Sequence, residues 1–438
     1  MRARNQRLQA ISNSLHLRML FGADIRVCNR DALLYERMTP APKTISEKIL
    51  SAKSGENAMA GDVVVCNVDY ALGTDASVPM AIDYFNAMGG TGVRHPERLV
   101  FALDHYAPAP NRETARLHQR TREFARAHGI ELWEVGDGIG HQLMVESDHV
   151  TEGSVVVGAD SHAVTYGALN AFATGIGSFD LAAIFISGRV WLRVPESIRI
   201  TIEGQLPRGV FAKDVALHLA KLLGADGATY LALEFAGRDL DLDTRLVLAN
   251  MSVETGAKNA VFPAAVIADA GAAYVREILL DLSNVAPQVA LPHQVDRVVG
   301  IEEAAGTPVG MVYLGTCTGG RVSDFHEARD VLKAGGGIAH GVQLVVTPAS
   351  RAVFEMLSRD GTLSDFIAMG AVIQTPGCGS CCGTCGSIPG DGVNVISTAN
   401  RNFKGRMGNS AANIYLASPA SCAAAAVKGA ISDPREYA

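Results

Sequence analysis

The segment "GSVVVGADSH", residues 153–162, decides the fold class. Its valines and small residues form a short apolar run that stops at Asp160, Ser161 and His162. Continuous apolar runs of this length are typical of strands that are covered on both faces of a sheet. Ligands of open α/β sheets bind beyond the carboxyl ends of such strands. We therefore expect a buried parallel strand here, with reactive side chains at its tip.

Four further apolar runs end in the same way. They are "RLVFAL" before Asp104 and His105, "MVYLGT" before Cys317, "AVIQTPG" before Cys378, and "VNVIST" shortly before Asn400 and Arg401. Helical patterns lie between these runs, at residues 113–127, 324–332 and 348–357 and after Ser418-Pro419. The alternation of strands and helices predicts an α/β fold with doubly wound layers, in which one cleft collects all five strand tips.

The length of the chain predicts more than one domain. A chain of 438 residues exceeds the roughly 250–300 residues at which single hydrophobic cores stop growing. The segment "SIRITIEG" alternates apolar and polar residues, which is typical of a half-exposed strand that opens a different domain. We place the domains at residues 42–193, 194–290 and 291–438, after an N-terminal extension, residues 1–41, that we expect to be poorly ordered.

The amino-acid composition limits the kind of molecule that the protein is expected to bind. The net charge is −7 and no block of like charges occurs, so neither nucleic acid nor an anionic membrane is an expected partner. No run approaches the roughly 18–20 apolar residues of a membrane helix, and the N-terminus lacks a secretory signal. We expect a cytoplasmic protein that acts on a small molecule. In a reducing compartment, its eight cysteines favour metal ligands or buried thiols over disulfides.

The segment "GCGSCCGTCG", residues 377–386, contains four of these cysteines. The spacing of Cys378 and Cys381 occurs in zinc sites, redox pairs and iron–sulfur sites alike. A zinc ribbon would need a second pair farther along the chain, and a ferredoxin would need a different spacing. Cys317 occupies a similar strand tip, so three thiolates could hold a cluster and leave one iron open as a Lewis acid. The alternative is that Cys317 binds no metal and is simply a small residue buried in the core.

Histidines next to carboxylates suggest proton transfer, because a carboxylate orients an imidazole and stabilises its charged form. Asp104 and His105 are adjacent, but neighbours on a strand point to opposite faces, so only a turn would let them cooperate. Asp160 and His162 would share one side of an extended chain. His118 lies in a polar helical pattern, and we expect it to face solvent.

Seven stretches resemble the large subunits of the aconitase family, most nearly its isopropylmalate dehydratase branch, over about residues 42–435. They are "DHYAP", "GIGHQ", "VVVGADSHAVTYGALNAFATGIGS", "NMSVETGAKNAVF", "GTCTGGR", "PGCGSC" and "ANRNFKGRMG". The resemblance implies three α/β domains around a central cluster cleft, without the swivelling fourth domain. A separate small subunit would carry that domain together with the serine base.

The resemblance also implies a [4Fe–4S] cluster that is held by Cys317, Cys378 and Cys381 and has one open iron. Cys382 and Cys385 are then not ligands, and we interpret them as packing residues rather than as a redox switch. Gly319 is a further departure, since the family usually has asparagine there. An amide near the cluster sulfurs is expected to be lost.

The activity that the resemblance implies is dehydration and rehydration between 3-isopropylmalate and 2-isopropylmalate, in leucine biosynthesis. His105 would protonate the leaving hydroxyl, supported by Asp104, and the other catalytic residues would be His141, Asp160, His162 and Glu254. The substrate-binding residues would be Ser161, Asn250, Arg401 and Arg406, although Arg401 could instead pair with a core carboxylate. Alternatives are homoaconitase, a dimethylmalate-type dehydratase, a cluster-free relative, and an RNA-binding iron sensor, which the acidic balance disfavours.

Overall fold

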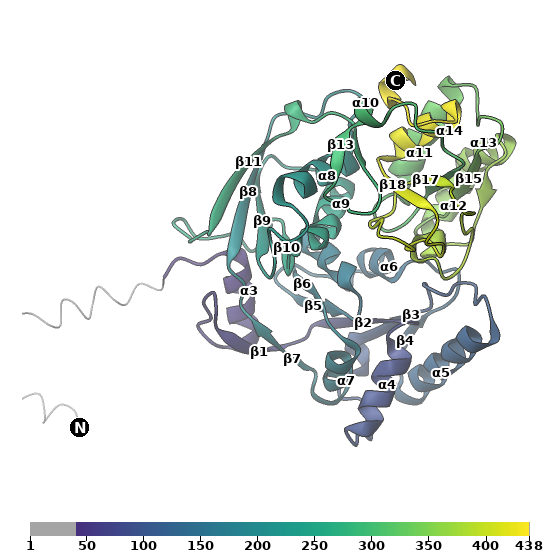
Figure 1. Ribbon diagram of the computed structural model, residues 1–438. Coiled ribbons are helices and arrows are strands. Elements are labelled where there is room, and N and C mark those ends of the chain that lie inside the picture. The colour runs from purple at the N-terminus through teal and green to yellow at the C-terminus, as the bar shows by residue number, and fades with distance from the viewer. Residues whose placement is uncertain (1–40, 438) are drawn as a thin grey trace, which may run out of the picture. The chain divides into compact units, whose positions relative to one another are not determined.

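The computed structural model describes residues 41–437, so the predicted N-terminal extension lies almost entirely outside the described residues (Figure 1). The described residues from 42 onward, 42–437, form one compact unit. In the described part of the chain, the strands form an antiparallel ribbon and three sheets of four, five and seven strands. The predicted boundary at 193/194 falls between two sheets, whereas the one at 290/291 falls within the seven-stranded sheet, between its strands at residues 288–290 and 298–300. The division into three domains stays a prediction. No described helix has both the length and the apolar character that crossing a bilayer requires.

The five-stranded sheet is parallel throughout and contains the opening segment as its strand β5. Its order is β4 (Glu131–Trp133), β3 (Leu99–Ala102), β2 (Tyr70–Thr74), β5 (Val155–Gly158) and β6 (Phe172–Gly175). Every strand residue from Val155 to Val157 is fully buried. The predicted buried strand is confirmed, and Asp160 follows its carboxyl end.

Both faces of this sheet are covered, which explains the uninterrupted valines. Val155 and Val157 join one core, while Val156 joins another. The first core includes helices on one side of the sheet (Figure 1), namely α4 (Val78–Ala87), α5 (Arg112–His128) and α7 (Ser178–Ser187). The second includes α6 (Gly140–Glu146) and the 3-10 segment η2 (Ser161–Leu169). Alternate side chains of one strand therefore pack against different layers.

The other three apolar runs that were predicted to end in reactive residues are strands of the seven-stranded sheet. Its order is β13 (Val298–Gly300), β12 (Gln288–Ala290), β18 (Asn413–Leu416), β17 (Asn394–Ser397), β14 (Met311–Leu314), β15 (Gln343–Val346) and β16 (Val372–Ile373). The five strands from β18 to β16 are parallel, and β12 and β13 form an antiparallel edge. One face packs on α11 (Val322–Ala334), α12 (Arg351–Arg359), α13 (Thr362–Ala368) and α14 (Pro419–Lys428).

The other face of this sheet packs on the core of the four-stranded parallel sheet. That sheet has the order β10 (Asn259–Val261), β9 (Ala232–Gly237), β8 (Ser197–Glu203) and β11 (Arg276–Asp281), and its core includes α8 (Ala212–Leu223) and α9 (Leu242–Ser252). Ile198, Ile200 and Ile202 are buried while their polar neighbours are more exposed, as the alternation predicted. The remaining elements are α3 (Ile45–Ser54), α10 (Ile301–Ala304) and the ribbon of β1 (Val63–Asn67) with β7 (Arg189–Arg193).

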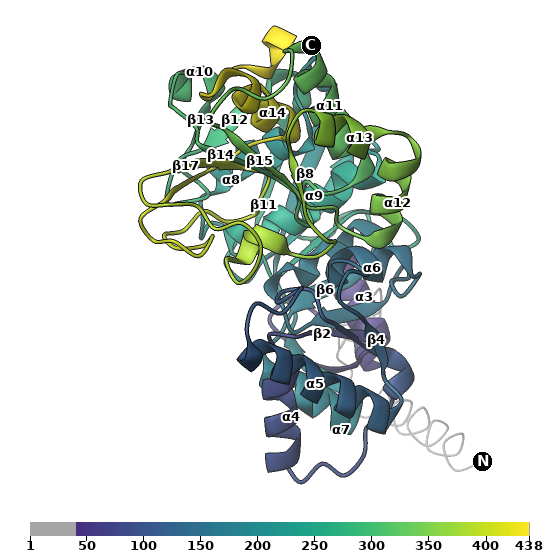
Figure 2. The ribbon, with the colours of Figure 1, turned by 90° about the vertical axis from the view of Figure 1, so that its right-hand side faces the viewer.

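The two sheets that carry the reactive tips meet near α6, which lies between them in both views (Figures 1 and 2). The backbone N–H of Ile139, just before α6, donates to the carbonyl of Ala349 at 2.8 Å. The predicted helix at residues 348–357 begins three residues later than expected, at Arg351. Its N-cap is Ser350, whose hydroxyl accepts a hydrogen bond from the backbone N–H of Val353.

Gly167 in η2 is packed so closely against β10 that no side chain fits. A β-carbon there would lie 1.7 Å from the backbone carbonyl oxygen of Ala260. We expect Gly167→Ala to lower the free energy of unfolding by about 3 kcal/mol, as overpacking does, and to lower the Tm in calorimetry. The control is Gly92→Ala, where nothing lies within 4 Å of the added carbon. Equal Tm values for the two variants would contradict this packing.

Candidate active site

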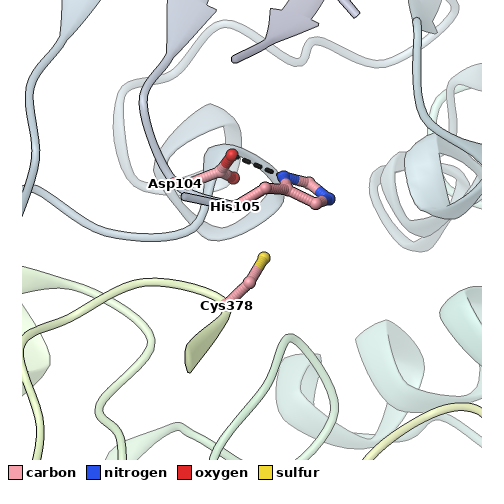
Figure 3. A group of neighbouring side chains, drawn as sticks. All are labelled: Asp104, His105 and Cys378. Atoms are coloured by element: carbon pink, nitrogen blue, oxygen red, sulfur yellow. Dashed lines mark hydrogen bonds and ion pairs between the residues drawn. The ribbon is translucent and has the colours of Figure 1, made fainter. Parts of the chain in front are cut away.

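The first half of the site is the turn after β3, where Asp104 and His105 interact. His105 Nδ1 lies 2.7 Å from Asp104 Oδ1 (Figure 3), and the Gly140 backbone N–H donates to Asp104 Oδ2 at 2.7 Å. The backbone N–H groups of His105 and Tyr106 donate to the two oxygens of Asp75, at 3.1 and 2.9 Å. This anchored turn gives the adjacent pair the contact that an extended strand would prevent.

The buried carboxylate of Asp75 has a further partner that the sequence prediction missed. His118 is 2% exposed, and its Nε2 lies 2.9 Å from Asp75 Oδ2. The expectation that His118 faces solvent is therefore wrong, because a buried carboxylate needs a partner. His118, Thr121 and Ala125 share the buried face of α5 at helical spacing, so the sequence did contain the pattern.

Asp160 is the centre of the second half of the site. Its Oδ1 lies 2.9 Å from His141 Nε2 and accepts the backbone N–H of His162 at 2.8 Å. Its Oδ2 lies 3.4 Å from His105 Nε2, which joins the two halves. Burial alone would raise the pKa of Asp160, but hydrogen bonds from the three histidines and the charge of His141 hold it well below 3.8. Asp160 is therefore ionised at neutral pH.

His105 lies between Asp104 and Asp160, which favours its charged form. Burial disfavours the imidazolium, but the neighbouring Cys378 sulfur, the Asp104 carboxylate and hydrogen bonds to both acids outweigh it. Together they hold the pKa of His105 well above 6.5. With Nδ1 directed at Asp104, the proton on Nε2 is the one available for transfer.

His162 extends the network toward the seven-stranded sheet. Its Nε2 lies 3.0 Å from Glu254 Oε1, and Arg401 Nε donates to both oxygens of Glu254 at 2.8 and 2.9 Å. Arg401 thus pairs with a buried carboxylate, as one reading of the sequence allowed, and its side chain also remains 26% exposed. On the other side, His141 Nδ1 lies 2.8 Å from the hydroxyl of Tyr166. The sequence prediction missed Tyr166, which follows His162 by four residues on η2.

Three cysteine thiols line one cavity of about 60 Å³ with this network. Cys317 follows β14, while Cys378 and Cys381 lie in the loop after β16. The same cavity is lined by His105, His141, Asp160, His162, Arg401 and Arg406. The Cys378 backbone N–H donates to the Asp104 carbonyl at 2.9 Å, and its sulfur points toward the Asp104–His105 pair (Figure 3). Residues at the carboxyl ends of strands from two sheets therefore converge on one cavity, as the sequence predicted.

Hydrogen-bond donors surround the sulfur atoms. The side-chain amides of Asn250 and Asn400 lie 3.1 and 3.5 Å from Cys317 Sγ, and Arg406 Nη2 lies 3.5 Å from Cys381 Sγ. Burial raises the pKa of Cys317 to about 11, so its free thiol is neutral. A bound metal would displace the proton, and the amides would then stabilise the thiolate.

The Cys317 loop is strained and tightly held. Thr316 adopts a positive φ of 76°, which residues other than glycine rarely do. Buried Lys213 donates to the Thr318 hydroxyl at 2.7 Å and to the Ala399 carbonyl at 3.1 Å, and burial lowers its pKa to about 8. The sequence prediction missed Lys213, although it shares the buried face of α8 with Leu217 and Ala220.

Gly319 lies against Thr398, and a β-carbon there would lie 2.4 Å from Thr398 Cβ. The expected loss of an amide near the sulfurs does not leave Cys317 without donors, because Asn250 and Asn400 supply them.

Two of the predicted substrate-binding residues do not line the cavity that contains the three thiols. Ser161 lines a neighbouring cavity of about 430 Å³, beside Thr174 and Lys258. Asn250 is fully buried behind Cys317.

Two groups have donor atoms close enough for a metal. The donor atoms of Asp104, His105 and Cys378 lie within 4.8 Å of one another, as do those of His141, Asp160 and His162. The nitrogens of the second group already make hydrogen bonds to Tyr166, Asp160 and Glu254. The cysteine side of the cavity is the better candidate, because thiolates are the ligands of iron–sulfur clusters.

Comparisons with known proteins agree with this geometry. A sequence profile described as "Aconitase family (aconitate hydratase)" matches residues 47–266 and 303–429. The 3-isopropylmalate dehydratase large subunit 2 of Archaeoglobus fulgidus is 47% identical over 416 residues, which cover 90% of this chain and 99% of that protein. The homoaconitase large subunit of Thermus thermophilus is 43% identical over 413 residues, with coverage of 90% and 98%.

A solved structure supports the fold alone. The crystal structure of Thermococcus kodakaraensis aconitase X, in its holo form, superposes with a TM-score of 0.52 at 16% identity. The match covers 77% of this chain and 84% of that one.

The contact of His162 with Glu254 predicts a measurable change in protonation. Burial lowers the pKa of His162, but hydrogen bonds to Asp160 and Glu254 raise it above 6.5 overall. In Glu254→Gln, the loss of this carboxylate and the unbalanced charge of Arg401 should lower the pKa of His162, so the ring loses its proton at lower pH. NMR titration of ¹⁵N-histidine-labelled protein would measure the shift.

The matched control is Glu131→Gln, which removes a carboxylate 2.9 Å from a different histidine, His149. It should leave the His162 titration unchanged. An unchanged His162 titration in Glu254→Gln would show that this contact does not control its protonation.

Proposed function

The chain belongs to the aconitase family, and we propose that it is the large, catalytic subunit of a hydro-lyase that interconverts 3-isopropylmalate and 2-isopropylmalate, as in leucine biosynthesis. One observation carries the proposal: three thiols line the same cavity as His105, which is paired with Asp104. The substrate follows from relatives that are 41–47% identical over nearly their whole length and are named 3-isopropylmalate dehydratase large subunits.

Enzymes of this family use an iron–sulfur cluster, and the cavity suits one. We propose a [4Fe–4S] cluster held by Cys317, Cys378 and Cys381, with one iron free of protein ligands. The chemistry of the donors supports the assignment, since three thiols converge and N–H groups surround two of the sulfurs. When bound, such a cluster supplies a Lewis acid for the hydroxyl and carboxylate oxygens of the substrate.

His105 is the proposed acid that protonates the departing hydroxyl group. Its high pKa keeps it charged at neutral pH, and Asp104 fixes Nδ1 so that Nε2 carries the transferable proton. In the reverse direction the neutral imidazole would accept that proton from water. Asp160, which also faces Nε2, would stabilise the charged form and hold His141 and His162 in place.

Arg401 and Arg406 are the proposed partners of the substrate carboxylates. Arg406 Nε is buried and has no hydrogen-bond partner among the described residues, which supports an anionic ligand beside it. Glu254 orients Arg401 through its Nε. Ser161 and Asn250 would affect the substrate less directly. Ser161 would act through the loop after β5, and Asn250 would act through its contact with Cys317.

The base that removes the proton beside the carboxylate is proposed to lie on a separate small subunit. Among the described residues, the histidines and acids of the cavity are bonded to one another, and His105 is already assigned to the hydroxyl group, so the proposal looks for the second proton acceptor on a partner. The relatives are named large subunits, which implies a small partner. This subunit would carry the swivelling domain. The similarity to homoaconitase large subunits makes a homoaconitase the second candidate.

The deciding experiment is anaerobic co-purification of the chain with the product of the neighbouring small-subunit gene, followed by assays with several hydroxy acids. We expect turnover of 3-isopropylmalate, and a loss of at least about 100-fold without the small subunit, as expected when a catalytic base is missing. Turnover of homocitrate alone would replace the first proposal by the second, and turnover of neither would reject both.

The proposed ligand set predicts iron content. Cys381→Ser should lose most of the bound iron and sulfide, because a weaker ligand would replace one of three thiolates. The control is Cys66→Ala, at a thiol that is buried beside α3 and β1. Iron and sulfide analysis of both anaerobic proteins measures the effect. Wild-type content in Cys381→Ser would remove that residue from the set.

A further inference from the structure

Two cysteines of the 377–386 segment have no role in the proposed reaction. Cys382, Gly383, Thr384 and Cys385 form a C-x-x-C sequence directly after the last proposed ligand. Cys382 is partly exposed and Cys385 is buried. The partial exposure of Cys382 does not suit a residue that serves only to fill space.

Both sulfur atoms lie against the same two backbone oxygens. Cys382 Sγ and Cys385 Sγ lie 3.4 and 3.3 Å from the carbonyl oxygen of His105. They also lie 3.8 and 3.5 Å from the carbonyl oxygen of Gly379. The two shared acceptors place the thiols in the same small region of the loop.

The turn between the two cysteines is fixed by its surroundings. Gly383 adopts a left-handed φ of 67°, and a β-carbon there would lie 2.2 Å from the backbone nitrogen of Gly408. Only glycine fits this position without displacing the neighbouring backbone. The backbone of the turn that carries both cysteines is therefore fixed by its packing against Gly408.

We propose that Cys382 and Cys385 are an oxidant-sensitive dithiol that forms a disulfide when it meets a hydroperoxide. Cys382, the accessible sulfur, attacks the peroxide and becomes a sulfenic acid, with release of one water or alcohol. The Cys385 thiol then attacks that sulfur, a disulfide bond forms and a second molecule, of water, leaves. Two thiols and one hydroperoxide are consumed, and the two electrons pass from sulfur to the peroxide oxygens.

The disulfide would act on the proposed acid. Its sulfurs carry no hydrogen, so the His105 carbonyl would lose both S–H donors and keep only the Thr384 hydroxyl, at 2.7 Å. His105 would then be held less firmly against Asp104 and Asp160. This consequence for catalysis rests on the proposed function, whereas disulfide formation does not.

Peptide mapping tests the disulfide without any substrate. The anaerobic complex of large and small subunit is exposed to hydrogen peroxide and alkylated, and the peptide that spans the pair is weighed. We expect the loss of two hydrogen atoms and of both alkylation sites, with recovery of both in dithiothreitol. Cys385→Ser should instead accumulate a sulfenic acid on Cys382 that dimedone captures, and Cys382→Ser should leave Cys385 reduced.

The proposal is overturned if the pair stays fully alkylated, if Cys382 bonds to Cys381 instead, or if Cys385 oxidises equally in Cys382→Ser. Cys66→Ala is the control and should behave as the wild type. A second measurement compares the turnover rates of the reduced and the oxidised complex. The oxidised complex should turn over about tenfold more slowly, as expected for a displaced catalytic group. Dithiothreitol should restore the rate, and the iron content should stay unchanged. Loss of activity in parallel with iron would assign the effect to the cluster site and overturn the link to His105.

Discussion

The site depends on one negative charge that is largely withdrawn from water. The Asp160 side chain is only 18% exposed, and a carboxylate with so little access to water is tolerated only when hydrogen bonds surround it. His105, His141 and His162 provide them, and each comes from a different segment of the chain. From His162 the hydrogen bonds continue through Glu254 to Arg401, beyond the end of β17. One carboxylate therefore fixes the relative positions of side chains from all three sheets.

The sulfur side of the cavity is organised before anything binds. Thr316 holds a strained φ next to Cys317, and such strain persists only where the surroundings enforce it. Lys213 ties this loop to the carbonyl of Ala399, and two amides point at the Cys317 sulfur. Little rearrangement is then needed for the three thiols to receive a cluster, which is what preorganisation of a metal site requires.

The reactive residues at the strand ends could be predicted from the sequence, because the change from apolar to polar residues is a local feature of the chain. A strand covered on both faces must be apolar, so the change to Asp160 or Cys317 marks its end, and parallel strands bring such ends to a common edge. The partners across sheets were not predictable in this way. His162 and Glu254 are 92 residues apart, and only the resemblance placed them together. His118 was missed because a polar side chain on a buried helix face was taken for a solvated one, and Lys213 was not singled out by the sequence at all.

The contact of Gly319 with Thr398 bears on how the protein could diverge. The resemblance to the aconitase family implies asparagine at the first position, yet here the space of its β-carbon is filled by the Thr398 side chain. The added carbon would meet Thr398 Cβ itself, so clearing the space without a backbone shift would require glycine at 398, which would also remove the hydroxyl that accepts the Gly315 N–H. A side chain at 319 is therefore coupled to the identity of residue 398, and evolution would reach it more readily through a paired change than through a single one.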